Sequence, residues 1–309
     1  MPSPYESHNA PAPNAQEWEA KKVERNPKGW IWTCLILAGV SILYRVLLLE
    51  TQEQTALMFI GLPTILAIAL AMTPTAKSTT GRICKGMTMA FLMFGILAIE
   101  GFICILMAAP LFYLIGAIIG KVIDSKRSKN VYCSVVVVLG IMSIEGVNES
   151  LSFERAETIT IQRDLEMSSD QVRQHLTQGP AFDLEQLPGF LQLGFPCPQN
   201  IKGNGIELGN TWTIHFAGGE GKPGDLVVQV TESTAERITL SCVSDQSHIA
   251  HWLSWKDITW NLDPTANDRT IVTMTINYNR DLDPAWYFKP IERYGVRKAG
   301  EYFCDQLFQ

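Results

Sequence analysis

Long apolar runs between positions 30 and 147 constrain this chain more than any other feature of its sequence. An α-helix rises about 1.5 Å per residue, so about 20 apolar residues cross the roughly 30 Å hydrocarbon core of a bilayer. The run over residues 30–49 has this length, and it begins with Trp30 and Trp32, a residue type that favours the membrane interface. The pattern therefore predicts that residues 30–147 form a bundle of transmembrane helices.

The apolar runs divide into about five predicted spans, at residues 30–49, 55–72, 85–99, 102–120 and 131–147. The division of the longest run rests on Glu100 and Gly101, a charged residue beside a flexible one near its middle. With five spans, all three clusters of Lys and Arg, 11 residues in total, lie on the cytoplasmic side, as the positive-inside rule requires. Four spans are the alternative, and they would leave the basic segment at residues 121–129 outside.

The same arrangement predicts where the parts of the chain lie. Residues 1–29 are polar and contain several prolines, so we expect a disordered N-terminal tail in the cytoplasm. We expect an integral protein of the plasma (inner) membrane, with the domain after the last span outside the cytoplasm. With four spans, that domain would instead lie in the cytoplasm.

Three ionisable residues, Arg45, Glu100 and Glu145, lie inside the apolar runs near the predicted outer ends of their helices. The simpler interpretation is that each side chain extends to the membrane interface. The alternative is a membrane polar cluster in which Arg45 pairs with Glu100 or Glu145 and fixes how the helices pack.

Charge separates the two halves of the chain and excludes some partners. Residues 1–147 carry 12 Lys and Arg against 9 Asp and Glu, whereas residues 148–309 carry 13 against 22. An acidic second half without a basic stripe is not expected to bind nucleic acid. The seven cysteines form no CxxC or CxxH motif, and His248 and His251 have no clear third ligand besides the nearby Asp245. We therefore expect no metal site and no cofactor.

The second half shows the pattern of an α+β domain, which we expect over residues 151–309. Segments that alternate apolar and polar residues predict strands at residues 158–163, 209–216, 225–231, 237–243, 252–261 and 269–278. A short helix is expected over residues 170–178 and a long amphipathic helix over residues 286–308. An antiparallel sheet that curves round one amphipathic helix buries one face of each and leaves a cleft between them.

This second half resembles the START-like superfamily, also called SRPBCC, the helix-grip fold shared by polyketide cyclases and lipid-transfer domains. The resemblance covers residues from about 155 to 309, and it rests on the strand order, on HIAHWLSWKDITWNLDP (residues 248–264), on TIVTMTINYNRDLDPAWYF (residues 270–288) and on the closing helix. It implies a hydrophobic cavity that holds a lipid, sterol, polyketide or other apolar molecule. It does not imply catalysis, because fold alone does not determine function.

Aromatic residues are the candidates for lining this cavity. They are Trp212, Trp252, Trp255, Tyr278, Tyr294 and Tyr302. Strict alternation along one strand places Trp252 and Trp260 on the same face as Ile258, with Trp255 on the opposite face. The candidates for catalysis are His215, which alternation places on the more polar face of its strand, with Asp245 or Asp257.

Three functions are compatible with these observations. The first is a membrane-anchored module that binds an apolar small molecule or lipid, drawn from the adjacent leaflet of the bilayer. The second is an enzyme of the cyclase, aromatase or hydrolase kind, which requires polar groups that converge in the cleft. The third is a non-catalytic membrane protein that binds another protein. The sequence favours binding over catalysis, and it leaves the ligand and the oligomeric state open.

Overall fold

The structure, a computed structural model, describes most of the chain. The described residues are 27–48, 61–97, 102–124, 145, 153–203, 205–219, 222–266 and 268–309. They belong to two compact units, one with residues up to 75 and residues 92–97, the other with residues 76–91 and 98–309.

Among its described residues, the first unit contains two apolar helices, α2 (Pro27–Leu48) and α3 (Leu62–Met72), which pack against each other. The end of α4 (Thr79–Leu97) joins them through Ile96, which is completely buried and clusters with Ala38 of α2. Many large apolar side chains of α2 and α3 remain exposed. Exposed apolar surface of this kind marks contact with a membrane or with another protein.

In the second unit, the first part of α4 packs closely against α5 (Phe102–Asp124). A Cβ atom at Gly120 would lie 2.4 Å from the Cα atom of Thr80, so only glycine allows this approach. The carboxylate of Asp124 accepts a hydrogen bond from the backbone N–H of Thr80 at 3.2 Å, which satisfies a donor in the first turn of α4.

Among the described helices, α5 alone is long and apolar enough to cross a membrane, over Ile103–Lys121 with a mean hydropathy of 2.4. The 11 residues of α3 rise about 16 Å, roughly half of the hydrocarbon core. Four of the five predicted spans fall wholly or partly among the described residues, which contain one candidate span, so the five-span prediction is wrong for this part of the chain. The predicted span at residues 131–147 lies outside the described residues, apart from Glu145.

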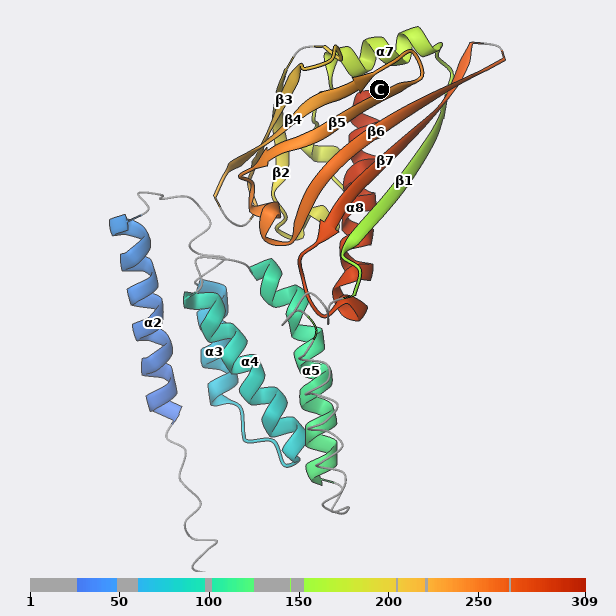
Figure 1. The fold of residues 1–309 in the computed structure, drawn as a ribbon. Coiled ribbons are helices and arrows are strands. Elements are labelled where there is room, and N and C mark those ends of the chain that lie inside the picture. Colours follow the sequence, from blue (N-terminus) through green and yellow to red (C-terminus); the bar gives the residue numbers. More distant parts are fainter. Residues whose placement is uncertain are drawn as a thin grey trace, which may run out of the picture. The chain divides into compact units, whose positions relative to one another are not determined.

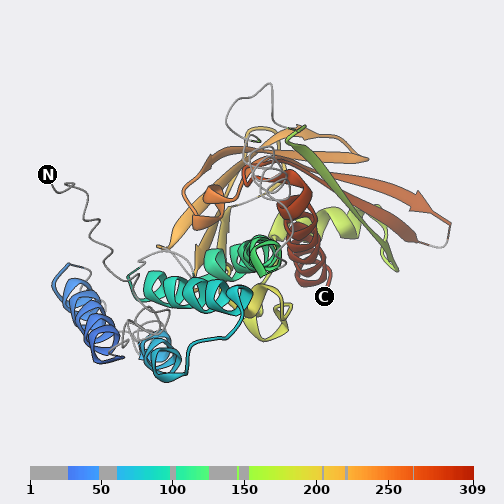
Figure 2. The ribbon, with the colours of Figure 1, turned by 90° about the horizontal axis from the view of Figure 1, so that it is seen from below.

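Seven antiparallel strands form one sheet in the second unit, in the order β1-β7-β6-β5-β4-β3-β2 (Figure 1). They are β1 (Ala156–Leu165), β2 (Cys197–Gly203), β3 (Thr211–Ala217), β4 (Gly224–Ser233), β5 (Arg237–Asp245), β6 (Leu253–Thr265) and β7 (Arg269–Arg280). The sheet curves around the helix α8 (Ala285–Leu307), as the view from below shows (Figure 2). This is the helix-grip architecture, so the predicted antiparallel sheet around a C-terminal helix is confirmed.

One strand, β2, was not predicted, because it lies in a segment rich in proline and phenylalanine. Pro198 lacks a backbone N–H and cannot donate to a neighbouring strand. It is tolerated here because β2 is the last strand of the sheet, with only β3 beside it.

The predicted short helix is present as α7 (Ser169–Gln178), and its first turn is closed by a capping box. The backbone N–H of Ser168 donates to Oε1 of Gln171 at 2.9 Å, and the backbone N–H of Gln171 donates to Oγ of Ser168 at 3.4 Å. The described part of the domain also contains three single-turn 3-10 helices: η3 (Leu184–Gln186), η4 (Leu191–Leu193) and η5 (His248–His251).

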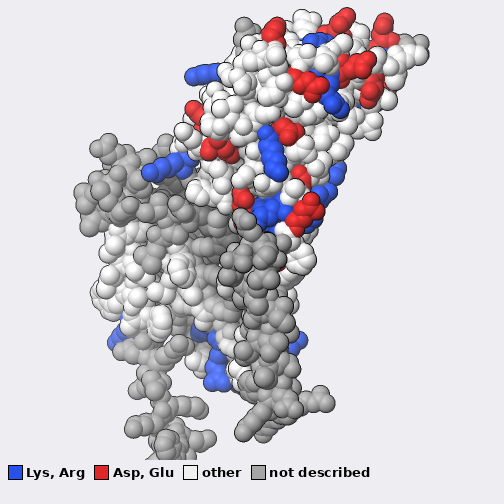
Figure 3. All heavy atoms as spheres, in the orientation of Figure 1, with Lys and Arg blue, Asp and Glu red and all other residues white. Residues whose placement is uncertain are grey.

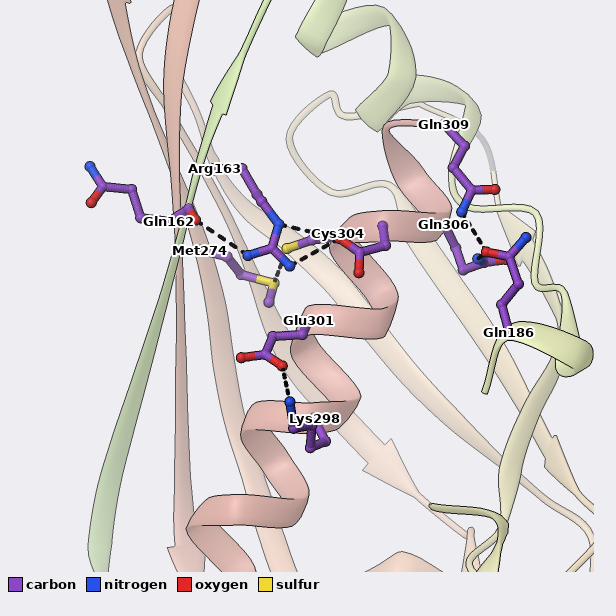
Figure 4. A network of polar contacts seen from close by, with 10 residues as sticks. Gln162, Arg163, Gln186, Met274, Lys298, Glu301, Cys304, Gln306 and Gln309 are labelled. Atoms are coloured by element: carbon purple, nitrogen blue, oxygen red, sulfur yellow. Dashed lines mark hydrogen bonds and ion pairs between the residues drawn. The ribbon is translucent and has the colours of Figure 1, made fainter. Parts of the chain in front are cut away.

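Polar contacts orient the C-terminal end of α8 on the sheet (Figure 4). Arg163 of β1 donates from Nε and Nη2 to Oδ1 of Asp305, at 3.2 and 2.9 Å, and Gln306 donates to Oε1 of Gln186 at 3.1 Å.

Acidic and basic side chains are interspersed over the visible face of this domain (Figure 3). Exposed ion pairs of this kind stabilise a fold by only about 0–1 kcal/mol each. The stability of the domain therefore comes mainly from its core.

The core lies where α8 crosses the concave face of the sheet. Trp260, Met274 and Val296 are among its buried side chains. A Cβ atom at Gly300 of α8 would lie 2.5 Å from Cδ1 of Ile161, so glycine brings the helix close to the sheet at this point. A cavity remains between α8 and the sheet, and it is lined by α8 residues from Phe288 to Phe303.

Candidate ligand-binding cavity

A cavity of about 160 Å³ lies between the concave face of the sheet and α8. Most of the side chains around it are aliphatic or aromatic. They include Ile214 of β3, Val228 of β4, Leu240 of β5, Ile258 of β6, Ile276 of β7 and Val296 of α8. An apolar cavity of about 150 Å³ stays dry and can hold a benzene-sized molecule. The wall therefore favours an uncharged, apolar occupant.

A bulge in β6 decides which of its side chains reach the cavity. Lys256 is an extra residue between Trp255 and Asp257, which have consecutive partners on β7. The extra residue shifts the alternation by one, so Trp255 packs against the same core as Ile258 and Trp260. The expectation that Trp255 faces the other way is wrong, because strict alternation cannot reveal a bulge.

The segment rich in proline and phenylalanine, at residues 187–200, closes one side of the cavity. Ring centroids are 5.0 Å apart for Phe190 and Phe195, and 5.4 Å apart for Phe195 and Trp252. These three rings form part of the wall. Sequence reasoning did not assign this segment to the site, although a concentration of aromatic residues outside the predicted elements was a usable signal.

Helix α5 also contacts the cavity within the second unit. Met107 of α5 is part of the wall, and its backbone carbonyl accepts a hydrogen bond from the Tyr287 hydroxyl at 2.5 Å. Nε1 of Trp252 donates to Sγ of Cys104 at 3.4 Å. The cavity and the candidate membrane span of the described residues therefore meet at one place.

Glu292 of α8 places a carboxyl group on this apolar wall. The side chain is buried, and neither carboxyl oxygen has a hydrogen-bond partner among the described residues. Burial raises the pKa of Glu292 to about 8, although the charge of Arg280 and the nearby backbone of Leu282 act in the opposite direction. The carboxyl group is therefore mostly protonated and uncharged at pH 7.

Two further polar atoms are buried close to Glu292 without a partner among the described residues, Nε1 of Trp255 and the hydroxyl of Tyr278. Trp255 and Tyr278 are opposite one another on β6 and β7, with ring centroids 6.2 Å apart. Burial, together with the charges of Glu292 and Glu157, raises the pKa of Tyr278. The phenol therefore stays protonated and remains able to donate.

The predicted cavity aromatics occupy different places. Those on the wall are Trp252, Trp255 and Tyr302. Trp212 instead borders a smaller cavity of about 50 Å³, and its Nε1 donates to the carbonyl of Gly205 at 3.0 Å. Tyr294 is half exposed, in a groove outside α8. Tyr278 is completely buried beside Trp255 and is not itself part of the wall.

Of the three candidates for catalysis, Asp257 alone borders the cavity. Nδ1 of His215 lies 2.6 Å from Oδ1 of Asp225, and the His215 side chain is partly exposed. Asp245 accepts a hydrogen bond at 2.8 Å from the backbone N–H of Ser247. Within the described ranges, no three His, Cys, Asp or Glu side chains gather in a way that could hold a metal ion.

The predicted membrane polar cluster is described only in part. Glu100 and the side chain of Arg45 lie outside the described residues, so their pairing stays a prediction. Oε1 of Glu145 accepts a hydrogen bond from the backbone N–H of Ala285 at 3.0 Å and lies 3.6 Å from Nη2 of Arg280. These described partners of Glu145 belong to the sheet domain.

Comparisons with known proteins add distant likenesses only. No known protein family and no curated protein matches the sequence. Among solved structures, norcoclaurine synthase from Thalictrum flavum in complex with dopamine and hydroxybenzaldehyde is similar with 14% identity and a TM-score of 0.36, over 50% of this chain and 85% of that one. Protein CV1439 from Chromobacterium violaceum is similar with 16% identity and a TM-score of 0.33, over 48% and 93%. The protein TTHA0849 from Thermus thermophilus is similar with 13% identity and a TM-score of 0.35, over 49% and 94%. Likenesses of this size do not establish a shared function.

Proposed function

We propose that the sheet domain binds an apolar small molecule or lipid in the cavity beside α8. The observation that carries this proposal is the cavity itself, about 160 Å³ in volume and surrounded by aliphatic and aromatic side chains. Protein interiors are close-packed, with few voids larger than a water molecule, and an empty cavity lowers stability. A core that keeps such a space at its centre is suited to an occupant.

We also propose that the N-terminal helices hold this domain at a membrane. Helix α5 has the length and composition of a membrane span, and its large side chains Phe112 and Leu114 are about half exposed. Met107 of the same helix is part of the cavity wall. An apolar molecule that leaves the bilayer along α5 would reach the cavity with little exposure to water.

The other two functions have less support. A domain that only binds another protein has no need of an internal cavity. An enzyme requires polar groups that converge on the substrate, and Asp257 is the one sequence-based candidate that borders the cavity. Its carboxylate already accepts a hydrogen bond from Nδ2 of Asn277 at 2.7 Å.

Identification of a bound molecule tests the proposal. The full-length protein is reconstituted in lipid nanodiscs, extracted with organic solvent and analysed by mass spectrometry, and an apolar fluorescent probe is titrated in parallel. Ala299→Leu adds bulk to the cavity wall, whereas Arg297→Leu places the same side chain on the exposed face of α8.

We expect Ala299→Leu to weaken probe binding at least tenfold and Arg297→Leu to leave it unchanged. An equal affinity of both variants and of the unmodified protein would contradict the proposal, because binding would then occur outside the cavity.

A further inference from the structure

Two buried polar groups on the cavity wall, and a third one beside them, have no hydrogen-bond partner among the described residues. They are Nε1 of Trp255 on β6, the hydroxyl of Tyr278 on β7 and the carboxyl group of Glu292 on α8. Buried polar groups nearly always have a hydrogen-bond partner, and leaving one without a partner is costly. Trp255 and Glu292 border the cavity and Tyr278 does not, so a polar atom of a molecule in the cavity would complete the first two groups.

The chemistry of the three groups restricts what that atom can be. The indole of Trp255 only donates, the phenol of Tyr278 donates or accepts, and a protonated Glu292 does both. An atom that joins Trp255 and Glu292 must accept from the indole, and it either donates to Glu292 or accepts from its protonated carboxyl group. A hydroxyl group satisfies this requirement, whereas a hydrocarbon satisfies none of it.

Formal charge on the ligand is disfavoured by the groups that surround Glu292. Arg280, the basic residue beside it, does not border the cavity; its Nη1 lies 2.6 Å from Oδ1 of Asp283, whereas its Nε and Nη2 have no hydrogen-bond partner among the described residues. Asp281 and Glu157 oppose ionisation of Glu292. Lys256 and Asp257 also border the cavity, but Lys256 is exposed and Asp257 accepts a hydrogen bond from Asn277, so a charged ligand group beside Glu292 would lack a matched partner of its own, which is costly.

We propose that this end of the cavity recognises an uncharged hydroxyl group, so that the ligand is an apolar alcohol whose hydrocarbon part fills the remaining space. The inference rests on the proposed function, since it assumes that the cavity is occupied. The ligand hydroxyl accepts from Nε1 of Trp255 and donates to Glu292. Trp255 and Glu292 both border the cavity, and the side chain of Glu292 is more than nine-tenths buried.

Three ligands of nearly equal size test this specificity. Ethylbenzene, benzyl alcohol and benzylamine share one ring, which suits the cavity volume, and they differ in a methyl, hydroxyl or ammonium group. Binding of each to the full-length protein in nanodiscs is measured by calorimetry at pH 7. The variants are Glu292→Leu, Glu292→Gln and Trp255→Phe, with Glu301→Leu as the control on the outer face of α8, where Glu301 pairs with Lys298.

We expect Glu292→Leu to lower the affinity for benzyl alcohol, relative to the affinity for ethylbenzene, about tenfold, which is the effect of one hydrogen bond. Glu292→Gln keeps an uncharged donor and acceptor, so it should preserve the preference, and Trp255→Phe should reduce it. Glu301→Leu should change nothing.

The two proposals fail in different ways. If both ethylbenzene and benzyl alcohol bind, and the ratio of their affinities is the same in Glu292→Leu as in the unmodified protein, the proposal of a hydroxyl site is wrong. The cavity would still be a binding site. If benzylamine binds most tightly and Glu292→Gln abolishes this, the group recognised is a cation and the proposal is overturned. If none of the three binds, the proposed function itself is contradicted.

Discussion

Oε1 of Glu145 lies 3.6 Å from Nη2 of Arg280, whose side chain is completely buried. The same Glu145 oxygen accepts a hydrogen bond from the backbone N–H of Ala285, in the first turn of α8. Nη1 of Arg280 also donates to Oδ1 of Asp283 at 2.6 Å. One buried guanidinium group therefore links the end of β7, the start of α8 and a residue far upstream in the chain.

Replacement of Arg280 by methionine should destabilise the domain strongly. The variant keeps a long apolar side chain but leaves Glu145 without its cationic partner and Asp283 with Arg155 alone, whose Nη2 lies 2.6 Å from Oδ2 of Asp283. Removal of one member of a buried ion pair costs about 3–5 kcal/mol. We expect a large fall in the midpoint of thermal unfolding of the full-length protein in nanodiscs. Arg297→Met, on the exposed face of α8, should change stability by no more than about 0.5 kcal/mol. Equal midpoints for the two variants would contradict this role for Arg280.

The raised pKa of Glu292 predicts a specific pH dependence of stability. In the folded state Glu292 keeps its proton up to about pH 8, whereas its ordinary value is 4.5. Between these values the folded state binds more protons than the unfolded state, so this residue lowers stability as pH rises from 4.5 to 8. Glu292→Gln carries no charge at any pH. Its unfolding midpoint relative to the unmodified protein should therefore rise from pH 5 to pH 8.

Thermal unfolding at both pH values checks this expectation. Glu301→Gln is the control, because it makes the same change on the outer face of α8, where Glu301 pairs with Lys298 at 2.8 Å. If Glu292→Gln and the unmodified protein follow parallel curves between pH 5 and pH 8, Glu292 is not held in its protonated form.

The sequence predicted the architecture of the second half well, because its signals are local. Alternation in the strands and the apolar stripe of the last helix were sufficient for a sheet that curves round α8. Two features could not be predicted in this way. The bulge at Lys256 leaves no mark in the alternation, and the proline in β2 argues against a strand unless the strand is known to lie at an edge.

The candidate site was harder to predict than the fold. Glu292 lies on an amphipathic helix, where a glutamate normally belongs to the solvent-facing side. Only the packing of α8 against the sheet shows that this glutamate faces the cavity. Trp212, by contrast, is an aromatic residue of the kind that lines cavities, but two glycines, Gly179 and Gly203, pack against its ring.

The position of Trp212 predicts that Gly203 cannot be replaced without cost. Gly203 is opposite Trp212 on the neighbouring strand, and a Cβ atom there would lie 2.5 Å from Cδ2 of the indole. The ring cannot move away easily, because its Nε1 is bonded to Gly205 and a second glycine, Gly179, lies against it. We expect Gly203→Ala to destabilise the domain by about 1–3 kcal/mol, the usual cost of overpacking.

Unfolding followed by tryptophan fluorescence measures this cost. Gly189→Ala is the matched control, since a Cβ atom at Gly189 meets nothing within 4 Å. A Gly203→Ala variant as stable as the Gly189→Ala variant would show that the ring has more freedom than the contacts indicate.

Helix α5 provides the test of membrane anchoring. Leu114 lies near the middle of the candidate span Ile103–Lys121 and is about half exposed. A lysine at the centre of a membrane helix costs about 2.5–3.5 kcal/mol of insertion free energy. Leu114→Lys should therefore shift the full-length protein from the membrane fraction toward the alkaline-extractable fraction. Leu208→Lys changes an exposed leucine of the sheet domain in the same way and should have no effect. If both variants stay equally in the membrane, α5 does not carry the anchoring, and α2, α3 or the residues between α5 and β1 would have to provide it.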